Sequence, residues 1–591
     1  MLINSLYPLF KLDSLNGFVV LAIGLFSVLT IIYSLGFMKA RQRLIQYYTY
    51  IILTALASIG AVLANHLILL LIFWGFLGLT LYLLINLGDD KSSLVAKKTF
   101  IIVGGSDALM LLGIGIIYHL TGTYQMDSIK ISLASPSTAL GMVRGMVSLP
   151  NHLSVNPLAG FAYICVAVAC FAKAGAMPFH SWIPDCAESA PVPVVAFLPA
   201  SLDKLLGIYL LARISLNLFV MNEVMNIILM LIGAFTIIAA VMMALVQHNM
   251  KRLLGYHAVS QVGYMVLGIG TGNPIGIAGG IFHMLNHAVY KSCLFLTAGN
   301  VESRTKTTEL DELGGLNKIM PITYISCLIA SLSISGVPPF NGFVSKWMVY
   351  QGLISQLRAT SYGLRATSIL CLVAAMFGSG LTLASFMKLI HATFLGQRAN
   401  GQMVRQAHHP SNHPERSRGT GQRVNEVNWT MWLPTVILAI ICVIFGVFAY
   451  QVPLKYFILP AVEGVNFIGT WYAGLSTLLI VVGLILGILV FKLKGLKVTI
   501  RQDTAFIGTE AMDLEQNRVT GTEFYNTVKE FGILKGIYKK AEAGFFDIYE
   551  QGKTIVFGIG KFLQYLHNGI LPTYLVWCLL GMLGLFLLFL K

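Results

Sequence analysis

Residues 171–185 read FAKAGAMPFHSWIPD and interrupt a long apolar run that begins at Pro157. Residues 335–346 read SGVPPFNGFVSK and interrupt a second apolar run, which begins at Pro321. Each break combines Gly and Pro with a nearby lysine, Lys173 or Lys346. A lysine inside a membrane helix costs about 2.5–3.5 kcal/mol on insertion scales and commonly marks an ion path, and paired helix breaks indicate an internal repeat with a site at each break. The alternative is that each lysine reaches the membrane interface through its long side chain.

The composition predicts an all-α polytopic membrane protein. The chain has 591 residues, of which 56% are hydrophobic and only 11% charged, whereas a soluble domain carries about 25% charged residues. Apolar runs long enough to span a bilayer, which requires about 20 residues, recur along almost the whole chain. We predict about fourteen membrane elements, at 15–37, 47–64, 67–87, 98–120, 157–176, 193–214, 224–246, 253–271, 276–299, 322–335 with a broken continuation to 354, 368–394, 429–450, 472–491 and 571–590.

The loops predict an orientation for these elements. Basic clusters follow alternate spans, at Lys39/Arg41/Arg43, Lys91/Lys97/Lys98, Lys251/Arg252, Arg304/Lys306/Lys318 and Lys492/Lys494/Lys497. Because Lys and Arg concentrate in cytoplasmic loops, these clusters are expected in the cytoplasm and the N-terminus outside, in the inner (plasma) membrane of a prokaryote. A cleavable signal peptide is not expected, since only Lys11 precedes the first span and no small-residue cleavage site follows it.

Several chemistries are not expected in this chain. The eight cysteines include no CxxC pair, which argues against Fe–S or structural zinc sites, and no Gly-rich phosphate loop follows a strand. We therefore expect no cofactor, no resident metal and no catalytic redox centre, so that the driving force comes from a partner or an ion gradient. The net charge of +15 is ascribed to cytoplasmic loops and not to binding of nucleic acid.

Two stretches depart from the membrane pattern. Residues 397–428 are rich in Arg and His without apolar periodicity, and they are predicted to be a disordered basic cytoplasmic insertion, with metal binding by the histidines as the alternative. In the region 498–569, residues Phe524–Gln564 place apolar and charged residues at helical spacing. That pattern predicts an amphipathic helix along the inner membrane face, or equally a helix that straps neighbouring subunits together.

Titratable residues inside the predicted spans form a candidate proton path. His283, His287 and Lys291 recur every four residues on one helix face, and Asp203 and Lys204 lie in the middle of another span. Burial favours the neutral form of lysine, and histidine titrates near neutral pH, so these groups can gain and release protons. The histidine pair alone also suits zinc, although no third ligand is apparent. The remaining candidates are Lys251, at the edge of its span, and His180, His257 and His391.

Four stretches resemble those of a known family. They are residues 171–185, KRLLGY at 251–256 with SQVGYM at 260–265, FHMLNHA at 282–288 with Lys291, and SGVPPFNGF at 335–343 with Ser345 and Lys346. They resemble the proton-conducting antiporter-like membrane subunits of respiratory complex I (chain L, M and N types), energy-converting hydrogenases, formate hydrogenlyase and Mrp cation/proton antiporters, over roughly residues 12–395.

The resemblance implies an architecture. It comprises two inverted five-helix repeats, each with a broken helix that carries a central lysine, and a long lateral helix that residues 521–549 loosely match. The implied segments are an N-terminal membrane helix (1–44), the first repeat (45–250), the second repeat (251–396), the insertion (397–428), additional membrane helices (429–497), the lateral helix region (498–569) and a C-terminal anchor helix (570–591).

The chain departs from the family pattern in three places. The family usually has a glutamate after the tryptophan of the third span, where this chain has Gly75, and that acid is the expected partner of Lys173. Pro199 stands where chain L-type members have a histidine, and Asp203 follows one turn later as a candidate substitute partner. Residues 12–15 resemble the start of the family's third helix, so the usual first two helices are expected to be missing.

The sequence predicts a non-redox subunit of a translocase that moves protons, or Na⁺ in their place. Protons would enter from the cytoplasm, rest on Lys173, cross through Lys251, His283, His287 and Lys291, and leave by Lys346. Expected partners are the lipid bilayer, other membrane subunits, and peripheral Fe–S, flavin or hydrogenase subunits whose redox energy drives transport. The alternatives are an Mrp-type secondary antiporter subunit, and a member of the family that serves inorganic-carbon uptake or is purely structural.

Overall fold

The computed structural model describes residues 9–39, 41–132, 157–358, 361–396, 426–467, 525–567 and 569–590, with a few isolated residues between 477 and 522. In this part of the chain, ten helices are long and apolar enough to cross a membrane, and each matches one predicted span. The chain is therefore a multi-pass membrane protein. The predicted span at 472–491 lies largely outside the described residues, as does the insertion up to residue 425.

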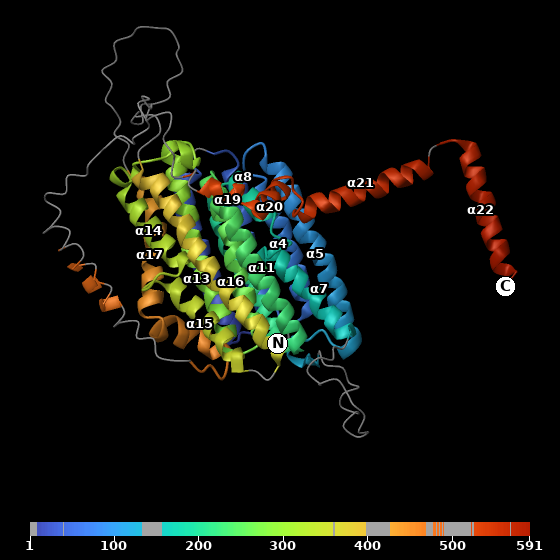
Figure 1. Ribbon diagram of the computed structural model, residues 1–591, viewed down its shortest axis with the longest axis horizontal. Coiled ribbons are helices and arrows are strands. Elements are labelled where there is room, and N and C mark those ends of the chain that lie inside the picture. Colours follow the sequence, from blue (N-terminus) through green and yellow to red (C-terminus); the bar gives the residue numbers. More distant parts are fainter. Residues whose placement is uncertain are drawn as a thin grey trace, which may run out of the picture. The chain divides into compact units, whose positions relative to one another are not determined.

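Two compact units make up the chain, Met1–Phe531 and Gly532–Lys591. In the first unit, long helices lie side by side along a common direction (Figure 1). Its helices are α2 (Ser14–Phe37), α3 (Leu44–Leu63), α4 (Leu67–Ile85), α5 (Ser92–Thr121), α7 (Pro157–Ala174), α8 (Trp182–Ser189), α9 (Val192–Phe197), α10 (Asp203–Arg213), α11 (Glu223–Leu245), α12 (Met250–Gly270), α13 (Pro274–Thr305), α14 (Pro321–Ser335), α15 (Asn341–Ser355), α16 (Tyr362–Ile390), α17 (Trp429–Val447) and α19 (Asn526–Glu530).

The centre of this bundle is α13, whose residues 275–301 are all buried. It packs against α12, α14, α15 and α17. Both α12 and α13 are long helices, of 21 and 32 residues, but neither is among the ten helices that are apolar enough to cross a membrane by composition. Polar and ionisable groups buried along a membrane helix are energetically costly and commonly mark a functional site.

The two helix breaks have the same local geometry. Gly175 ends α7 with φ +78°, and Gly336 ends α14 with φ +80°, a left-handed conformation that glycine adopts without a steric penalty. In each case the next amide reaches back five residues, from Ala176 N to Phe171 O at 2.9 Å and from Val337 N to Leu332 O at 3.1 Å. The sequence prediction of two broken helices is confirmed, although their relation as inverted repeats stays a prediction.

Proline shapes the helix that carries Asp203. Pro199 has no N–H to donate, and residues Leu198–Leu202 form a π-helical turn between α9 and α10. The carbonyl oxygen of Ala196 accepts hydrogen bonds from the hydroxyls of Ser201 (3.0 Å) and Ser292 (2.9 Å). The wide turn therefore joins the two helices without an unsatisfied carbonyl at Ala196, and Asp203 follows immediately as the first residue of α10.

The basic loops meet at one end of the bundle, which we call the basic end. There Asp185 pairs with Lys98 at 2.6 Å and with Arg252 at 3.3 Å. Two described residues at the margins of the stretches 397–425 and 468–524, which are largely outside the described part of the chain, also lie at this end. Glu426 accepts hydrogen bonds from the first amides of α14 (Ile322 N at 2.9 Å), and Thr522 bonds Asp311 between α13 and α14.

The opposite end is held by a short parallel strand pair that the sequence did not predict. β1 (Ile131–Ser132) pairs with β2 (Phe219–Val220), with Ile131 opposite Phe219. Two single bridges, Phe10 with Ala64 and His66 with Gln125, join further segments at this end. These contacts fix the loops after α3, α5 and α10 relative to one another.

The second unit contains α20 (Gly532–Glu542), α21 (Ile548–Leu566) and α22 (Leu571–Phe589). The predicted amphipathic helix over 524–564 is thus divided, with a turn that contains Gly544 at φ +75°. α21 has one apolar face and one polar face, and no residue of α21 or α22 is buried. The apolar face of α21 comprises Ile548, Ile555, Val556, Ile559, Phe562, Leu563 and Leu566.

Candidate functional site

Lys173 lies in the last turn of α7 with its ammonium group buried in the bundle. Its Nζ is 3.9 Å from Oδ1 of Asp203 on α10, and the two side chains are 0% and 1% exposed. The indole ring of Trp74 on α4 lies 5.5 Å from the same Nζ. The spacing of thirty residues between the lysine and the acid could not have shown this pairing, which the sequence offered only as a candidate.

A second acid faces Lys173 that the sequence reasoning missed. Asp107 lies in the middle of α5 and interacts electrostatically with Lys173 beside Trp74. Gly75, where the family glutamate would stand, lies on an exposed face of α4, and a Cβ there would meet nothing within 4 Å. The carboxylates at Lys173 therefore come from α5 and α10. A lone acid inside an apolar helix is the signal that could have identified Asp107.

Lys204 and Lys291 continue the row of buried cations. Lys204 follows Asp203 on α10, and its Nζ lies 5.7 Å from the ring of Trp182. It interacts electrostatically with Lys291 on α13. The Nζ of Lys291 lies 5.7 Å from each of two phenylalanine rings, Phe295 and Phe386. Neither lysine nitrogen has a hydrogen-bond partner in the described part of the chain. Water molecules would have to supply those hydrogen bonds.

Lys346 lies in α15, beyond the second break, whereas Lys173 precedes the first. Its Nζ reaches back to donate to the Ile334 carbonyl at 2.9 Å and to Ser379 Oγ at 3.1 Å. The ring of Tyr264 lies 4.7 Å away. Among the described residues, Lys346 pairs with no acid, so its positive charge is held only by a carbonyl, a hydroxyl and an aromatic face.

The two break glycines share a neighbour of the same kind. A Cβ placed on Gly336 would lie 3.6 Å from Lys346 Nζ, and one placed on Gly175 would lie 3.4 Å from Lys204 Nζ. Lys204 thus lies beside the first break as Lys346 lies beside the second. Lys173 is a further cation in the first half, and Asp203 interacts electrostatically with both Lys173 and Lys204.

Histidines connect the two lysine sites. His283 Nδ1 is 2.9 Å from Ser345 Oγ, and its Nε2 is 3.1 Å from Gln261 Oε1. His287, one turn along α13, interacts electrostatically with Lys204, Lys291 and His283. Both imidazoles are completely buried. They fill the interval between Lys291 and Lys346.

His257 on α12 forms a second connection. It interacts electrostatically with Lys291, Lys346 and Lys388, and its Nε2 is 2.7 Å from Ser385 Oγ. Lys388, in the last turn of α16, was not predicted. Its Nζ donates to the carbonyls of Leu245 (2.7 Å) and Gln247 (2.8 Å) at the basic end. A lysine near the end of a span, facing helix C-terminal carbonyls, is a weak signal in the sequence.

The other predicted candidates lie elsewhere. Lys251 forms an ion pair with Glu302 at 3.3 Å at the basic end, and His257 occupies the interval in which Lys251 was expected. His180 is buried in the turn between α7 and α8. His391 is exposed where α16 ends. The structure therefore groups eight of the eleven predicted residues around one buried row: Lys173, Asp203, Lys204, His257, His283, His287, Lys291 and Lys346.

This arrangement suits the transfer of protons between neighbouring groups. The row contains acids at Lys173, then amines, then imidazoles, all of which can accept or release a proton, and a backbone carbonyl at the second break faces it. In the part of the chain that the structure describes, no group of three or more His, Cys, Asp or Glu could hold a metal ion.

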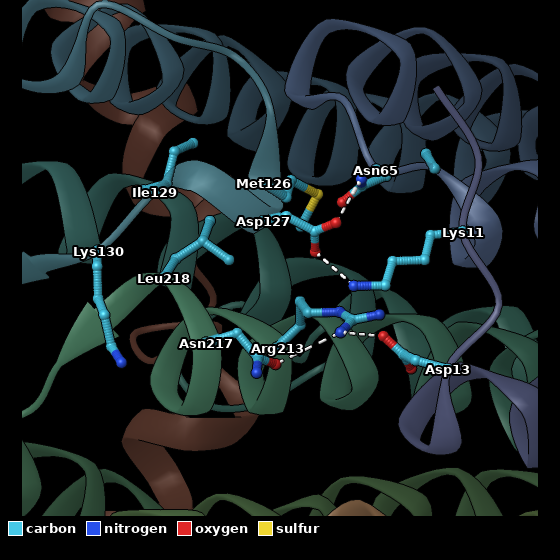
Figure 2. Close-up of a pocket in the computed structure, with 11 residues that line it drawn as sticks. Lys11, Asp13, Asn65, Met126, Asp127, Ile129, Lys130, Arg213, Asn217 and Leu218 are labelled. Carbon is cyan, nitrogen blue, oxygen red and sulfur yellow. Dashed lines mark hydrogen bonds and ion pairs between the residues drawn. The ribbon is translucent and has the colours of Figure 1, made fainter. Parts of the chain in front are cut away.

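A separate polar pocket of about 250 Å³ lies at the opposite end of the bundle (Figure 2). Figure 2 shows Arg213 pointing toward Asp13, at 2.6 Å, and Lys11 toward Asp127, at 2.9 Å. Asp13 also caps α2 by accepting from the amides of Leu15 and Asn16. None of the predicted path residues lines this pocket. Arg213 is nevertheless the last residue of α10, the helix that begins with Asp203.

One family model matches the part of the chain that contains both breaks and the buried row. The model of the family described as NADH:quinone oxidoreductase/Mrp antiporter, TM, matches residues 64–385. The chain belongs to this family. The matched residues include both helix breaks and all eight residues of the buried row, so the site lies inside the part that defines membership.

Curated relatives are bacterial membrane proteins. The chain is 31% identical over 454 residues to the Na(+)/H(+) antiporter subunit A1 of Staphylococcus haemolyticus (strain JCSC1435), covering 74% of this chain and 52% of the relative. It is 30% identical over 506 residues to the subunit of that name from Staphylococcus aureus (strain MRSA252), covering 81% and 58%. The chain thus spans about half the length of the curated relatives it matches.

Solved structures share the fold. A chain of the membrane-bound sulfane sulfur reductase, an archaeal respiratory membrane complex, superposes with a TM-score of 0.72 at 23% identity, covering 98% of this chain and 89% of that one. A chain of the Mrp complex from Dietzia sp. DQ12-45-1b superposes with a TM-score of 0.63 at 22% identity, covering 76% and 84%.

Proposed function

We propose that this chain is a proton-translocating membrane subunit of a multi-subunit complex. The observation that carries the proposal is the continuous row of buried titratable groups between the two helix breaks. Burying so many amines and imidazoles costs free energy, so their presence indicates a function. Intramembrane ionisable groups that line a path are typical of proton relays. Membership of a family of membrane subunits supports the same conclusion.

The proposed route begins at the basic end, which we place in the cytoplasm because Lys and Arg concentrate in cytoplasmic loops. A proton is held on Lys173 between Asp203 and Asp107, where two carboxylates stabilise the ammonium ion. It moves along Lys204 and Lys291 and reaches the second half through the histidines of α12 and α13. It leaves from Lys346, which has no carboxylate among the described residues to retain it.

Partners are part of the proposal because α21 and α22 of the second unit bury no residue within the described chain. We assign α22 to the membrane and the apolar face of α21 to a contact with the membrane or with a neighbouring membrane subunit. A peripheral redox module is the proposed energy source, since the fold also occurs in a chain of an archaeal respiratory membrane complex. The proposed location is the plasma membrane of a prokaryote, with the N-terminus outside.

A second candidate is a secondary Na⁺/H⁺ antiporter subunit without a redox partner. The names of the Staphylococcus relatives favour this reading. The two candidates use the same buried row and differ in what drives it. In the first, electron transfer in a partner changes the charge along the row. In the second, a Na⁺ gradient drives the proton across.

One experiment tests the function and separates these two candidates. Inverted membrane vesicles that contain the complex are loaded with a pH-sensitive dye, and proton uptake is followed after a pulse of reductant or of NaCl. We expect Lys346→Met to abolish transport without loss of the assembled complex, because methionine keeps the length and removes the titratable amine. The control is Lys318→Met, at an exposed lysine of the basic end.

The outcomes are distinct. Proton uptake after reductant supports the redox-driven pump, and proton movement after NaCl alone supports the antiporter. Wild-type transport in the Lys346→Met variant would overturn the proposed route, whichever pulse drives it.

A further inference from the structure

His283 has a hydrogen-bond partner on each ring nitrogen, and this feature constrains where its proton lies. The imidazole is completely buried on α13. On one side, Nδ1 is 2.9 Å from the hydroxyl oxygen of Ser345, the residue before Lys346. On the other side, Nε2 is 3.1 Å from Oε1 of Gln261 on α12, and the Tyr290 hydroxyl lies 3.3 Å from the same nitrogen.

The partners differ in what they can do. A hydroxyl donates or accepts, so Ser345 is compatible with either tautomer of a neutral imidazole. The carbonyl oxygen of the Gln261 amide can only accept, so the nitrogen that faces it must carry the hydrogen. Gln261 therefore selects the tautomer with hydrogen on Nε2, and the Ser345 hydroxyl then donates to the free lone pair of Nδ1.

We propose that Gln261 is the positioning residue that keeps the unprotonated nitrogen of His283 facing Ser345 and Lys346. This inference rests on the proposed proton path and deepens it, because it gives the histidine a defined face for receiving a proton. Without the amide, the two tautomers of a neutral imidazole would be nearly equivalent here, and half of the histidines would present an N–H where an acceptor is needed.

The transfer step balances through the serine. A proton that reaches Ser345 Oγ from a neighbouring ammonium or hydronium ion forms a new O–H bond, while the original hydroxyl proton passes to Nδ1. The resulting imidazolium donates Nδ1–H to Ser345 Oγ and Nε2–H to Gln261 Oε1. The serine hydroxyl then turns to the carbonyl of Gly342 (3.3 Å) or Asn341 (3.5 Å) at the start of α15. The same steps in reverse return the Nδ1 proton through the Ser345 hydroxyl and restore the neutral ring with hydrogen on Nε2, so that His283 takes up and releases its proton on the Lys346 side.

The test measures the tautomer directly, in the full-length chain. ¹⁵N-histidine-labelled protein in lipid bilayers is examined by solid-state NMR, because the ¹⁵N shifts of a ring nitrogen distinguish protonated from unprotonated. A His283→Gln variant identifies the signals. We expect wild-type His283 to carry hydrogen mainly on Nε2. In Gln261→Met, which keeps the size and removes the acceptor, we expect the tautomer ratio to change about fivefold, as for loss of one neutral hydrogen bond.

Two further variants separate tautomer selection from general disturbance of α12. Gln261→Glu keeps an acceptor and should retain the Nε2–H tautomer. Ser260→Ala, the matched control, removes a buried hydroxyl that donates to Ile237 O at 3.0 Å and does not touch His283, and it should leave both the NMR signal and transport unchanged. Proton uptake by vesicles should fall by up to about twofold in Gln261→Met, as the competent tautomer falls to about half, and recover in Gln261→Glu.

A wild-type His283 that carries hydrogen on Nδ1, or a spectrum that Gln261→Met leaves unaltered, would overturn the inference. The NMR result does not require transport, so failure of the proposed function is distinguishable. If Gln261→Met changes the tautomer while proton uptake stays at the wild-type rate, the tautomer assignment stands and the role of His283 in the path is refuted.

Discussion

Asp203→Asn is the sharpest perturbation of the first half of the path. The substitution keeps the size of the side chain and removes the carboxylate that lies 3.9 Å from Lys173 Nζ. Two unit charges about 4 Å apart attract by about 4 kcal/mol at an effective dielectric constant of about 20, which corresponds to about a thousandfold change in an equilibrium. Asp107 also faces Lys173, so part of the attraction remains. We expect proton transport to fall about tenfold or more.

The assay is dye quenching in inverted vesicles, normalised to the amount of assembled complex. Asp127→Asn is the control, because it makes the same chemical change in an ion pair whose side chains are 41% and 47% exposed. Exposed pairs contribute only about 0–1 kcal/mol, so transport should not change. The double variant Asp107→Asn with Asp203→Asn should abolish transport, since Lys173 then has no carboxylate of the buried row beside it.

One result would refute this reasoning. If Lys173→Met and Asp203→Asn both transport protons at the wild-type rate, the first half of the bundle does not conduct and only the half that contains Lys346 does. A complementary variant, Gly75→Glu, restores the family acid on an exposed face of α4. We expect that it does not rescue Asp203→Asn, and rescue would show that an acid on that face reaches the lysine after all.

Three further predictions concern the second half, the orientation and the tail. Lys388→Met should lower transport less than Lys346→Met does, because Lys388 is held by carbonyls at the basic end, and equal losses would show that it is an obligatory step. A protease confined to the outer face of intact cells should not cut at Arg416, and a cut there would reverse the orientation. Removal of residues after Phe531 should leave the remaining spans inserted but weaken co-purification of partner subunits, since α21 and α22 bury no residue in the described chain, and unchanged co-purification would contradict the proposed role of the tail.

The sequence predicted the main features of the fold because membrane helices are long and apolar and their breaks are marked by Gly and Pro. The basic loops likewise gave an orientation to test. The division of the predicted amphipathic helix at Gly544 and the strand pair at Ile131 and Phe219 were not predicted. The division depends on the left-handed backbone conformation of Gly544, which the helical spacing of its neighbours does not reveal. The strand pair joins two-residue segments that are too short to leave a pattern in the sequence.

The site was only partly predictable, for a reason that lies in geometry. His283, His287 and Lys291 share one helix, so their spacing alone places them on one face. Asp107 and Lys173 belong to different helices, and nothing in their separation along the chain indicates that they meet. His257, and not Lys251, lies beside Lys291, because Lys251 is in the first turn of α12 and pairs with Glu302 at the basic end.

The unbroken helix α13, Pro274–Thr305, has an electrical consequence. Lys291 and His283 are eight residues apart, which is about 12 Å along a helix axis. This is about two fifths of the thickness of the hydrocarbon core, about 30 Å. A proton that passes from one to the other therefore moves through the membrane voltage, and at about 2.3 kcal/mol per 100 mV for a full crossing, this step alone costs about 0.9 kcal/mol per 100 mV. The passage between the two halves, which looks like a sideways connection, is a step at which the potential opposes the pump.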